Sequence, residues 1–211
     1  MLDINKLHST KLATNISAAV MLPDNYNTVS DTYKPVFVLA LSNIFLGTDY
    51  QKIVNEKKIA LIAIYPSLNI KKNELLFESF ESNYDFSYLY QDFIINEVIK
   101  ALEVKYRISK NYLDRTIIGN DISSLMALTM PLDFTSTFGK QIIINLNLDK
   151  TFKKMLCYLE SKFNPEIEMN LSMQNTNHLQ VINKLLKDFG IKIFKEIKNN
   201  SLSYILQTLD N

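Results

Sequence analysis

The most constraining feature of the sequence is an alternation between short apolar runs and stretches with helical periodicity. Pro35–Leu41 and Ile59–Tyr65 are continuous apolar runs of strand length, which is typical of strands buried on both faces. Between Tyr88 and Arg107 the apolar residues recur instead at the spacing of a helix. The pattern therefore predicts buried strands of a parallel sheet with a helix packed against it.

The same alternation continues to the end of the chain. Further strands are predicted over Asn15–Leu22, Thr116–Ile118, Gln141–Leu148, Glu166–Met173 and Ile191–Ile197, and further helices directly after Gly119 and over Thr151–Phe163, Leu179–Phe189 and Ser201–Leu209. Strands that alternate with helices form a mainly parallel sheet covered on both faces. The predicted fold class is α/β, a three-layer sandwich.

Composition excludes several classes of protein. The 211 residues are 47% apolar and 21% charged, which predicts one globular domain over residues 1–211. A net charge of +1 gives no excess of basic residues of the kind that binds nucleic acid or anionic membranes. The longest apolar run is too short to span a bilayer, and no signal-peptide pattern is visible, so a cytoplasmic location is expected.

Metal and disulfide chemistry are also not expected. Cys157 is the single cysteine, so it can form neither an internal disulfide nor a cysteine-rich zinc site. The two histidines, His8 and His178, lie too far apart in sequence to give metal-ligand spacing. We therefore predict no metal and no cofactor.

Ligands of such sheets bind beyond the carboxyl ends of the strands, so the loops there are examined first. In the segment 116–124 a strand runs through Gly119 directly into a helix. This is the layout of a nucleophile elbow, Gly-x-Nu-x-Gly, in which the nucleophile occupies a strained turn with positive φ. Gly119 and Ser123 take the two small positions, and Asp121 stands where the nucleophile belongs.

The chain resembles the esterase branch of the α/β-hydrolases, which contains tributyrin esterases, esterase D and enterochelin-esterase-like enzymes. Four segments carry the resemblance: Ala18–Pro23 followed by Tyr26, Pro35–Leu41, Tyr84–Ile108, and Asp114–Gly119. They resemble the opening strand and its turn, the strand before the oxyanion loop, the helix before the elbow, and the elbow strand. The resemblance implies an α/β-hydrolase fold without a large cap domain.

The residues that perform catalysis in that family are replaced. The elbow serine is Asp121, and the two glycines that follow it are Ser123 and Ser124. The His-Gly of the oxyanion loop is Ser42-Asn43, the acid loop 173–177 has no carboxylate, and the turn that supplies histidine aligns with Lys198–Asn200. The chain has four glycines where average usage predicts about fifteen, which reflects the same replacements.

The replacements lead to three functional hypotheses. The first is a protein that has lost hydrolysis and binds a small-molecule ligand or a protein partner, with Ser42, Asn43, Asn120, Ile122 and Asn200 as pocket positions. The second is a weak carboxylesterase for short-chain acyl esters with a rebuilt site. The third is a hydrolase that uses Asp121 as its nucleophile, as haloalkane dehalogenases and epoxide hydrolases do. The resemblance also implies a homodimer by analogy.

Structural roles compete with these hypotheses. Asp121 is also a good helix N-cap residue. Ser123 and Ser124 lie on the first helical turn, where no base is evident for a displaced nucleophile, and Cys157 is expected to pack in a helix. His178 is expected at the surface near a helix start and His8 in an exposed or structural position. One group of aromatic residues is expected either to line a ligand pocket or a partner surface, or to cap the hydrophobic core of the sheet: Phe77, Phe80, Tyr84, Phe86, Tyr88 and Tyr90.

Overall fold

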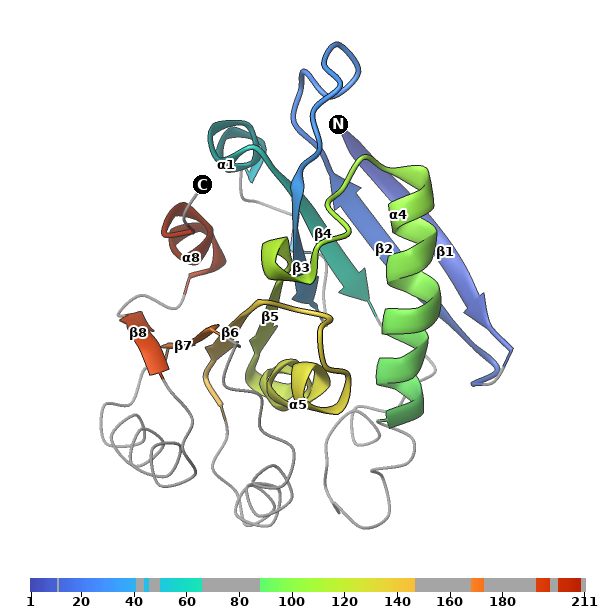
Figure 1. The fold of residues 1–211 in the computed structure, drawn as a ribbon, viewed down its shortest axis with the longest axis vertical. Coiled ribbons are helices and arrows are strands. Elements are labelled where there is room, and N and C mark those ends of the chain that lie inside the picture. The colour runs from blue at the N-terminus through green and yellow to red at the C-terminus, as the bar shows by residue number, and fades with distance from the viewer. Residues whose placement is uncertain are drawn as a thin grey trace.

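The centre of the structure, a computed structural model, is an eight-stranded sheet in the order β1-β2-β4-β3-β5-β6-β7-β8 (Figure 1). The structure describes residues 1–10, 12–40, 44–45, 50–65, 88–146, 168–172, 193–197 and 201–209. The strands are β1 (Leu2–Ser9), β2 (Thr14–Met21), β3 (Lys34–Leu39), β4 (Ile59–Tyr65), β5 (Thr116–Asn120), β6 (Lys140–Ile144), β7 (Glu168–Ser172) and β8 (Ile193–Ile197).

Six of these strands run parallel to one another, as the sequence predicts. β3 pairs with β4 and β5, and the pairs β5–β6, β6–β7 and β7–β8 continue in the same direction. Only β1 and β2 break the pattern, because β1 pairs with β2, and β2 with β4, in antiparallel fashion. The carboxyl ends of β3, β4, β5 and β6 therefore lie along one edge of the sheet.

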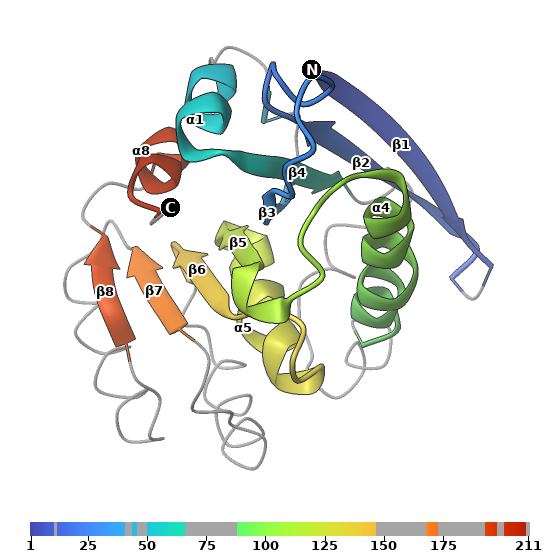
Figure 2. The same ribbon diagram turned by 45° about the horizontal axis from the view of Figure 1, so that its top comes forward.

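Helices cover both faces of the sheet (Figure 2). On one face lie α1 (Tyr50–Lys57) and α8 (Leu202–Gln207). On the other lie α5 (Ser124–Asp133) and a helix over residues 88–105, which contains a π-helical segment, η1 (Ile94–Ile99), and ends as α4 (Lys100–Lys105). Val36 and Val38 of β3 pack toward α1 while Phe37 and Leu39 pack toward α4, so β3 is buried on both faces.

The sequence prediction misses β1 and α1 and places some element ends differently. β1 carries its apolar Leu2 and Ile4 on the exposed side, 48% and 62% exposed, and turns its polar Asp3 and Asn5 toward α4. Because these apolar residues lie on the exposed face and these polar ones face the protein, β1 does not show the pattern that usually identifies a strand. β6 ends at Ile144 instead of Leu148, because Asn145 adopts a left-handed backbone with φ 51°. The predicted helices 151–163 and 179–189 lie outside the described residues.

Two of the segments that carry the family resemblance pack against each other. The turn after β2 and the end of α4 meet where the guanidinium of Arg107 lies over the ring of Tyr26, 4.0 Å from its centroid. The Arg107 backbone N–H donates to the Tyr26 hydroxyl at 2.8 Å, and the guanidinium donates to the carbonyl of Val29 at 2.9 Å. This contact fastens the turn to the helix that precedes β5.

A polar cluster joins β1 to the end of α4. The Lys105 ammonium donates to Asp3 at 2.8 Å and to Asn5 at 2.6 Å, and the Tyr106 hydroxyl donates to Asp3 at 2.5 Å. The hydrogen bonds from Lys105 and Tyr106 lower the pKa of the Asp3 carboxyl below its ordinary value of 3.8.

Among the described helices, none is both long and apolar enough to cross a membrane.

The lowered pKa of Asp3 predicts acid-dependent stability. Its carboxylate stabilises the fold above pH 4, and this contribution disappears as pH falls through the lowered folded-state pKa. Asp3→Asn should therefore lower Tm at pH 7 by less than about 3 °C, because the group is half-exposed, and the difference from the parent should shrink toward pH 2. Thermal unfolding from pH 2 to pH 7 measures this; an equal difference at every pH would contradict the assignment.

Candidate functional site

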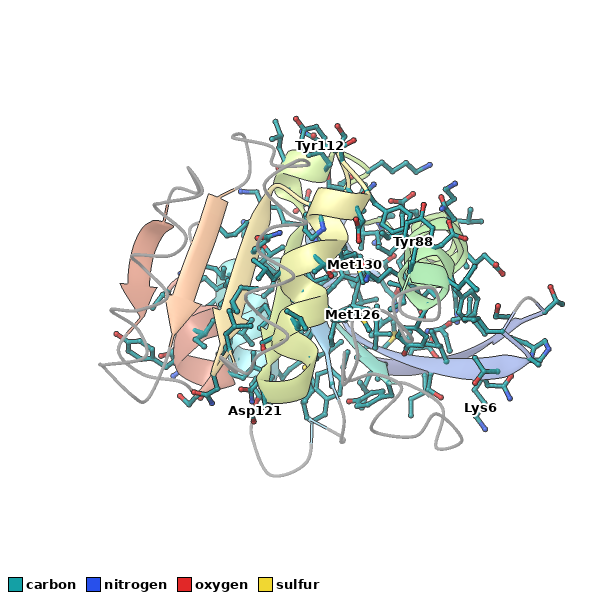
Figure 3. The ribbon with its side chains drawn as sticks, turned by 90° about the horizontal axis from the view of Figure 1, so that it is seen from below. Lys6, Tyr88, Tyr112, Asp121, Met126 and Met130 are labelled. Atoms are coloured by element: carbon teal, nitrogen blue, oxygen red, sulfur yellow. The ribbon has the colours of Figure 1, made fainter. Side chains whose placement is uncertain are left out.

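The sharpest turn at the carboxyl edge of the sheet joins β5 to α5. β5 ends at Asn120, a short 3₁₀ turn η3 (Asp121–Ser123) follows, and α5 begins at Ser124. Asp121 is exposed and has a left-handed backbone with φ 49°. Figure 3 places it at the end of α5, at the periphery of the molecule. The predicted strand–turn–helix elbow with positive φ at Asp121 is therefore present.

Gly119 lets the helix approach the strand at this turn. A Cβ atom on Gly119 would lie 2.4 Å from the carbonyl oxygen of Ser123 and 2.6 Å from the Cβ of Ala127. Real Cβ atoms do not come this close to a backbone oxygen, so this position requires glycine. The tight contact fixes the start of α5 against β5, and it fixes the conformation of the turn between them.

The two serines after Asp121 use their hydroxyl groups within this turn. Ser123 Oγ donates to the carbonyl of Leu39 at 2.7 Å and accepts from the backbone N–H of Asn120 at 3.0 Å. Ser124 Oγ donates to the carbonyl of Asp121. Both side chains are buried, with Ser123 9% and Ser124 1% exposed. They therefore have structural roles, as the sequence analysis expects, and neither is placed as a displaced nucleophile.

The helix-cap alternative for Asp121 is wrong. The N-cap of η3 is Asn120 and the N-cap of α5 is Ser123, while Asp121 lies between them with a left-handed backbone. An N-cap residue normally has an extended backbone, which Asn120 has, with φ −130° and ψ 138°. Asp121 thus occupies the strained position of the elbow, and its neighbours Asn120 and Ser123 are the N-cap residues.

Asn145 is a site residue that the sequence analysis misses. It follows β6, has φ 51°, and donates from Nδ2 to Oδ1 of Asn120 at 3.3 Å. Asn120 pairs with Ile144 in the sheet, so the ends of β5 and β6 lie side by side. Asparagine is the non-glycine residue best suited to a left-handed backbone. That signal was hidden because asparagine is frequent throughout the chain.

The loop after β3 also reaches this edge. Within it, the backbone N–H of Ile44 donates to the hydroxyl of Tyr65, at the end of β4, at 3.2 Å. Burial raises the pKa of the Tyr65 hydroxyl, so it remains protonated at neutral pH. In nucleophile-elbow hydrolases an N–H of this loop completes the oxyanion hole. Here this described N–H is directed to a side chain of the protein itself.

Comparison with known proteins gives the family. The model of the family described as "Putative esterase" matches residues 9–145. The chain belongs to this esterase family. The match includes β2 to β6 and the whole elbow, and a search of curated proteins finds no match.

Solved structures agree on the α/β-hydrolase fold of this esterase-family chain. S-formylglutathione hydrolase from Staphylococcus aureus is 16% identical with a TM-score of 0.67, over 98% of this chain and 92% of that one. An IroE-like serine hydrolase from Shewanella oneidensis is 14% identical with a TM-score of 0.72, over 98% and 78%. A ferulic acid esterase from Anaeromyces mucronatus, in complex with ferulic acid, is 13% identical with a TM-score of 0.66, over 98% and 87%.

The other predicted site residues of this esterase-family chain are distributed as follows. Asn120 is exposed beside Asp121, and Ile122 lies in η3 with its side chain outside the described part. Ser42, Asn43, His178, Cys157 and Asn200 all lie outside the described residues. Within the described ranges, no group of three or more His, Cys, Asp or Glu residues is placed to hold a metal ion.

The remaining histidine and aromatic residues lie away from the elbow or in the core. His8 is exposed on β1, the outermost strand of the sheet, which β2, β4 and β3 separate from β5. Its Nδ1 lies 2.9 Å from Oδ1 of Asn15. Tyr90 is buried in the core, as the core alternative expects, whereas Tyr88 is 38% exposed and stacks on Phe134 at 5.0 Å. Phe77, Phe80, Tyr84 and Phe86 lie outside the described residues.

The close contact at Gly119 predicts a large effect of one methyl group. Gly119→Ala should lower the free energy of unfolding by about 1–3 kcal/mol or more, because the new Cβ meets backbone atoms that cannot move independently. Urea unfolding measures the change. Ser123→Ala, which removes one hydroxyl without adding an atom, should cost only about 1 kcal/mol. Equal stability of Gly119→Ala and the parent would contradict the close approach.

Proposed function

We propose that this esterase-family protein does not hydrolyse esters and that it uses the elbow edge of the sheet to bind a small-molecule ligand or a protein partner. The observation that carries the proposal is the aspartate at the left-handed position of the elbow. A serine there attacks after a base removes its proton, and an aspartate carboxylate has no such proton to lose. Ser-type acyl transfer therefore has no nucleophile at this position.

The neighbouring groups support the proposal. The Ser123 and Ser124 hydroxyls donate to backbone carbonyls, so neither is prepared for attack on a substrate. The Ile44 N–H donates to Tyr65, so this donor is not directed at a developing oxyanion. His8 is separated from β5 by β2, β4 and β3 in the sheet, so it cannot serve as the base. Among the described residues, the serine hydroxyls and the Ile44 N–H therefore bond to other groups of the protein, and His8 lies on a distant strand.

Hydrolysis of 4-nitrophenyl butyrate tests the proposal directly. The parent, Asp121→Ala, and the control Glu56→Ala, which changes an exposed carboxylate on α1, should all react at the rate of buffer alone. An oxyanion hole and binding alone sustain about 10³ to 10⁴ over water in a complete site, so the assay must resolve that range. Turnover by the parent that only Asp121→Ala abolishes would make Asp121 catalytic. Turnover unaffected by the variant would place a working esterase site elsewhere, and either result would refute the proposal.

A second candidate function rests on the exposure of Asp121. An exposed carboxylate on a strained elbow has the geometry of the nucleophile in haloalkane dehalogenases and epoxide hydrolases. Attack on an alkyl halide or epoxide would form an alkyl ester on the Asp121 carboxylate and release halide or open the ring. Release of that ester requires an activated water, and no base for it stands beside Asp121 among the described residues.

Intact-protein mass spectrometry separates this second candidate from the binding proposal. After incubation with 1,2-epoxybutane, the binding proposal predicts no adduct at Asp121, because an unassisted carboxylate is a weak nucleophile. Peptide mapping locates any added mass, and Asp121→Asn serves as the control that keeps the shape of the side chain. An adduct on Asp121 that is absent in Asp121→Asn would favour the Asp-nucleophile hydrolase.

A further inference from the structure

A second polar site lies at the opposite edge of the sheet from Asp121. Six residues, Asp24, Asn25, Asp31, Tyr33, Asn55 and Lys58, line a cleft of about 250 Å³, which we call the Tyr33 cleft. Tyr33 directly precedes β3 and Lys58 directly precedes β4, whereas Asp121 directly follows β5. Because these strands are parallel, the Tyr33 cleft and the elbow lie at opposite ends of them.

One wall of the Tyr33 cleft is already held by internal hydrogen bonds. Asn55 Nδ2 donates to the Asp24 carboxylate at 2.7 Å, and the Asp24 backbone N–H donates to Asn55 Oδ1 at 2.9 Å. These two bonds join the turn after β2 to the end of α1. Asp24 and Asn55 therefore shape the cleft, and other residues are left to contact a ligand.

Two opposite charges in the Tyr33 cleft are not paired with each other. Asp31 and Lys58 are both exposed, and within the described part of the chain neither makes an ion pair or a side-chain hydrogen bond. The Asp31 carboxylate and the Lys58 ammonium stand more than 4.0 Å apart. A carboxylate and an ammonium are thus presented to the same small space with a gap between them.

Tyr33 forms a buried part of the cleft wall. Its side chain is only 2% exposed, and its hydroxyl has no hydrogen-bond partner among the described residues. Burial raises the pKa of this hydroxyl, and the charge of Asp31 raises it further. A buried hydroxyl without a partner costs stability.

We propose that the Tyr33 cleft binds a small zwitterion, of which a free α-amino acid is the simplest example. The ligand ammonium pairs with Asp31 and the ligand carboxylate with Lys58, while the Asn25 amide supplies a hydrogen bond. A ligand with one charge would meet one attractive and one repulsive partner, whereas a zwitterion satisfies both. The volume lies below the about 300 Å³ at which clefts for drug-sized ligands begin, so a small molecule is the fitting class.

The expected affinity is weak, because both charged partners are exposed to water. Each exposed ion pair contributes at most about a fivefold change in affinity, so a dissociation constant of about 1 mM or weaker is expected for so small a ligand. Binding is therefore best followed by amide chemical shifts in ¹⁵N-labelled protein. Glycine is the probe, with methylammonium and acetate at equal concentration and ionic strength as the single-charge comparisons.

Variants for this experiment can be chosen so that the fold is kept. Lys58 directly follows α1 and has a left-handed backbone with φ 51°, so Lys58→Asn removes the charge with a residue that tolerates this conformation. Asp31→Asn removes the other charge without a change of shape. Lys52→Gln is the matched control, because Lys52 lies on α1 and pairs with Glu56 outside the cleft.

The proposal predicts saturable glycine shifts confined to residues 24–34 and 55–59. Lys58→Asn and Asp31→Asn should each weaken glycine binding by about fivefold, and Lys52→Gln should leave it unchanged. The absence of saturation, equal binding of methylammonium or acetate, or unchanged binding in both cleft variants would each overturn the proposal. Asp121→Ala should not affect this titration, so its result is independent of whether the elbow is catalytic.

Discussion

The close approach of α5 to β5 at Gly119 is the contact on which the candidate site depends. With the Ser123 carbonyl 2.4 Å from where a Cβ would lie, the chain has almost no freedom between strand and helix. The turn must reverse within η3, and Asp121 takes a left-handed backbone as a result. Because β5 pairs with both β3 and β6, this one turn is fixed against the ends of two neighbouring strands.

The hydroxyls of Ser123 and Ser124 help to hold this turn. A glycine lets the backbone approach closely and offers no further contact, whereas Ser123 joins the elbow to the end of β3 through the carbonyl of Leu39. Ser124 makes a second bond to the carbonyl of Asp121. The Ile44–Tyr65 hydrogen bond similarly joins the loop after β3 to the end of β4. Groups that could face a substrate instead bind to their own backbone and side chains.

The sequence predicts most of the sheet and the elbow because both depend on local signals. Apolar runs such as Ile59–Tyr65 identify buried parallel strands, and Gly119 between a strand and a helix identifies the turn. β1 escapes prediction because its Asp3 and Asn5 are stabilised by Lys105, about a hundred residues away, which no local pattern reveals. The Ile44–Tyr65 contact is missed for the same reason, since it depends on which strand ends become neighbours.

The elbow geometry by itself does not argue for catalysis. Asp121, with its positive φ, lies within the turn that the packing of Gly119 against Ser123 and Ala127 fixes in place. A strained backbone conformation persists when the packing around it holds it in place, whether or not a reaction takes place there. The fold therefore preserves the place of a nucleophile independently of the chemistry, and function must be argued from the side chains that stand around it. At this elbow those side chains are a carboxylate, two amides and two serine hydroxyls that already donate to backbone carbonyls. Among the described residues at the elbow, these groups include hydrogen-bond donors and acceptors but no histidine.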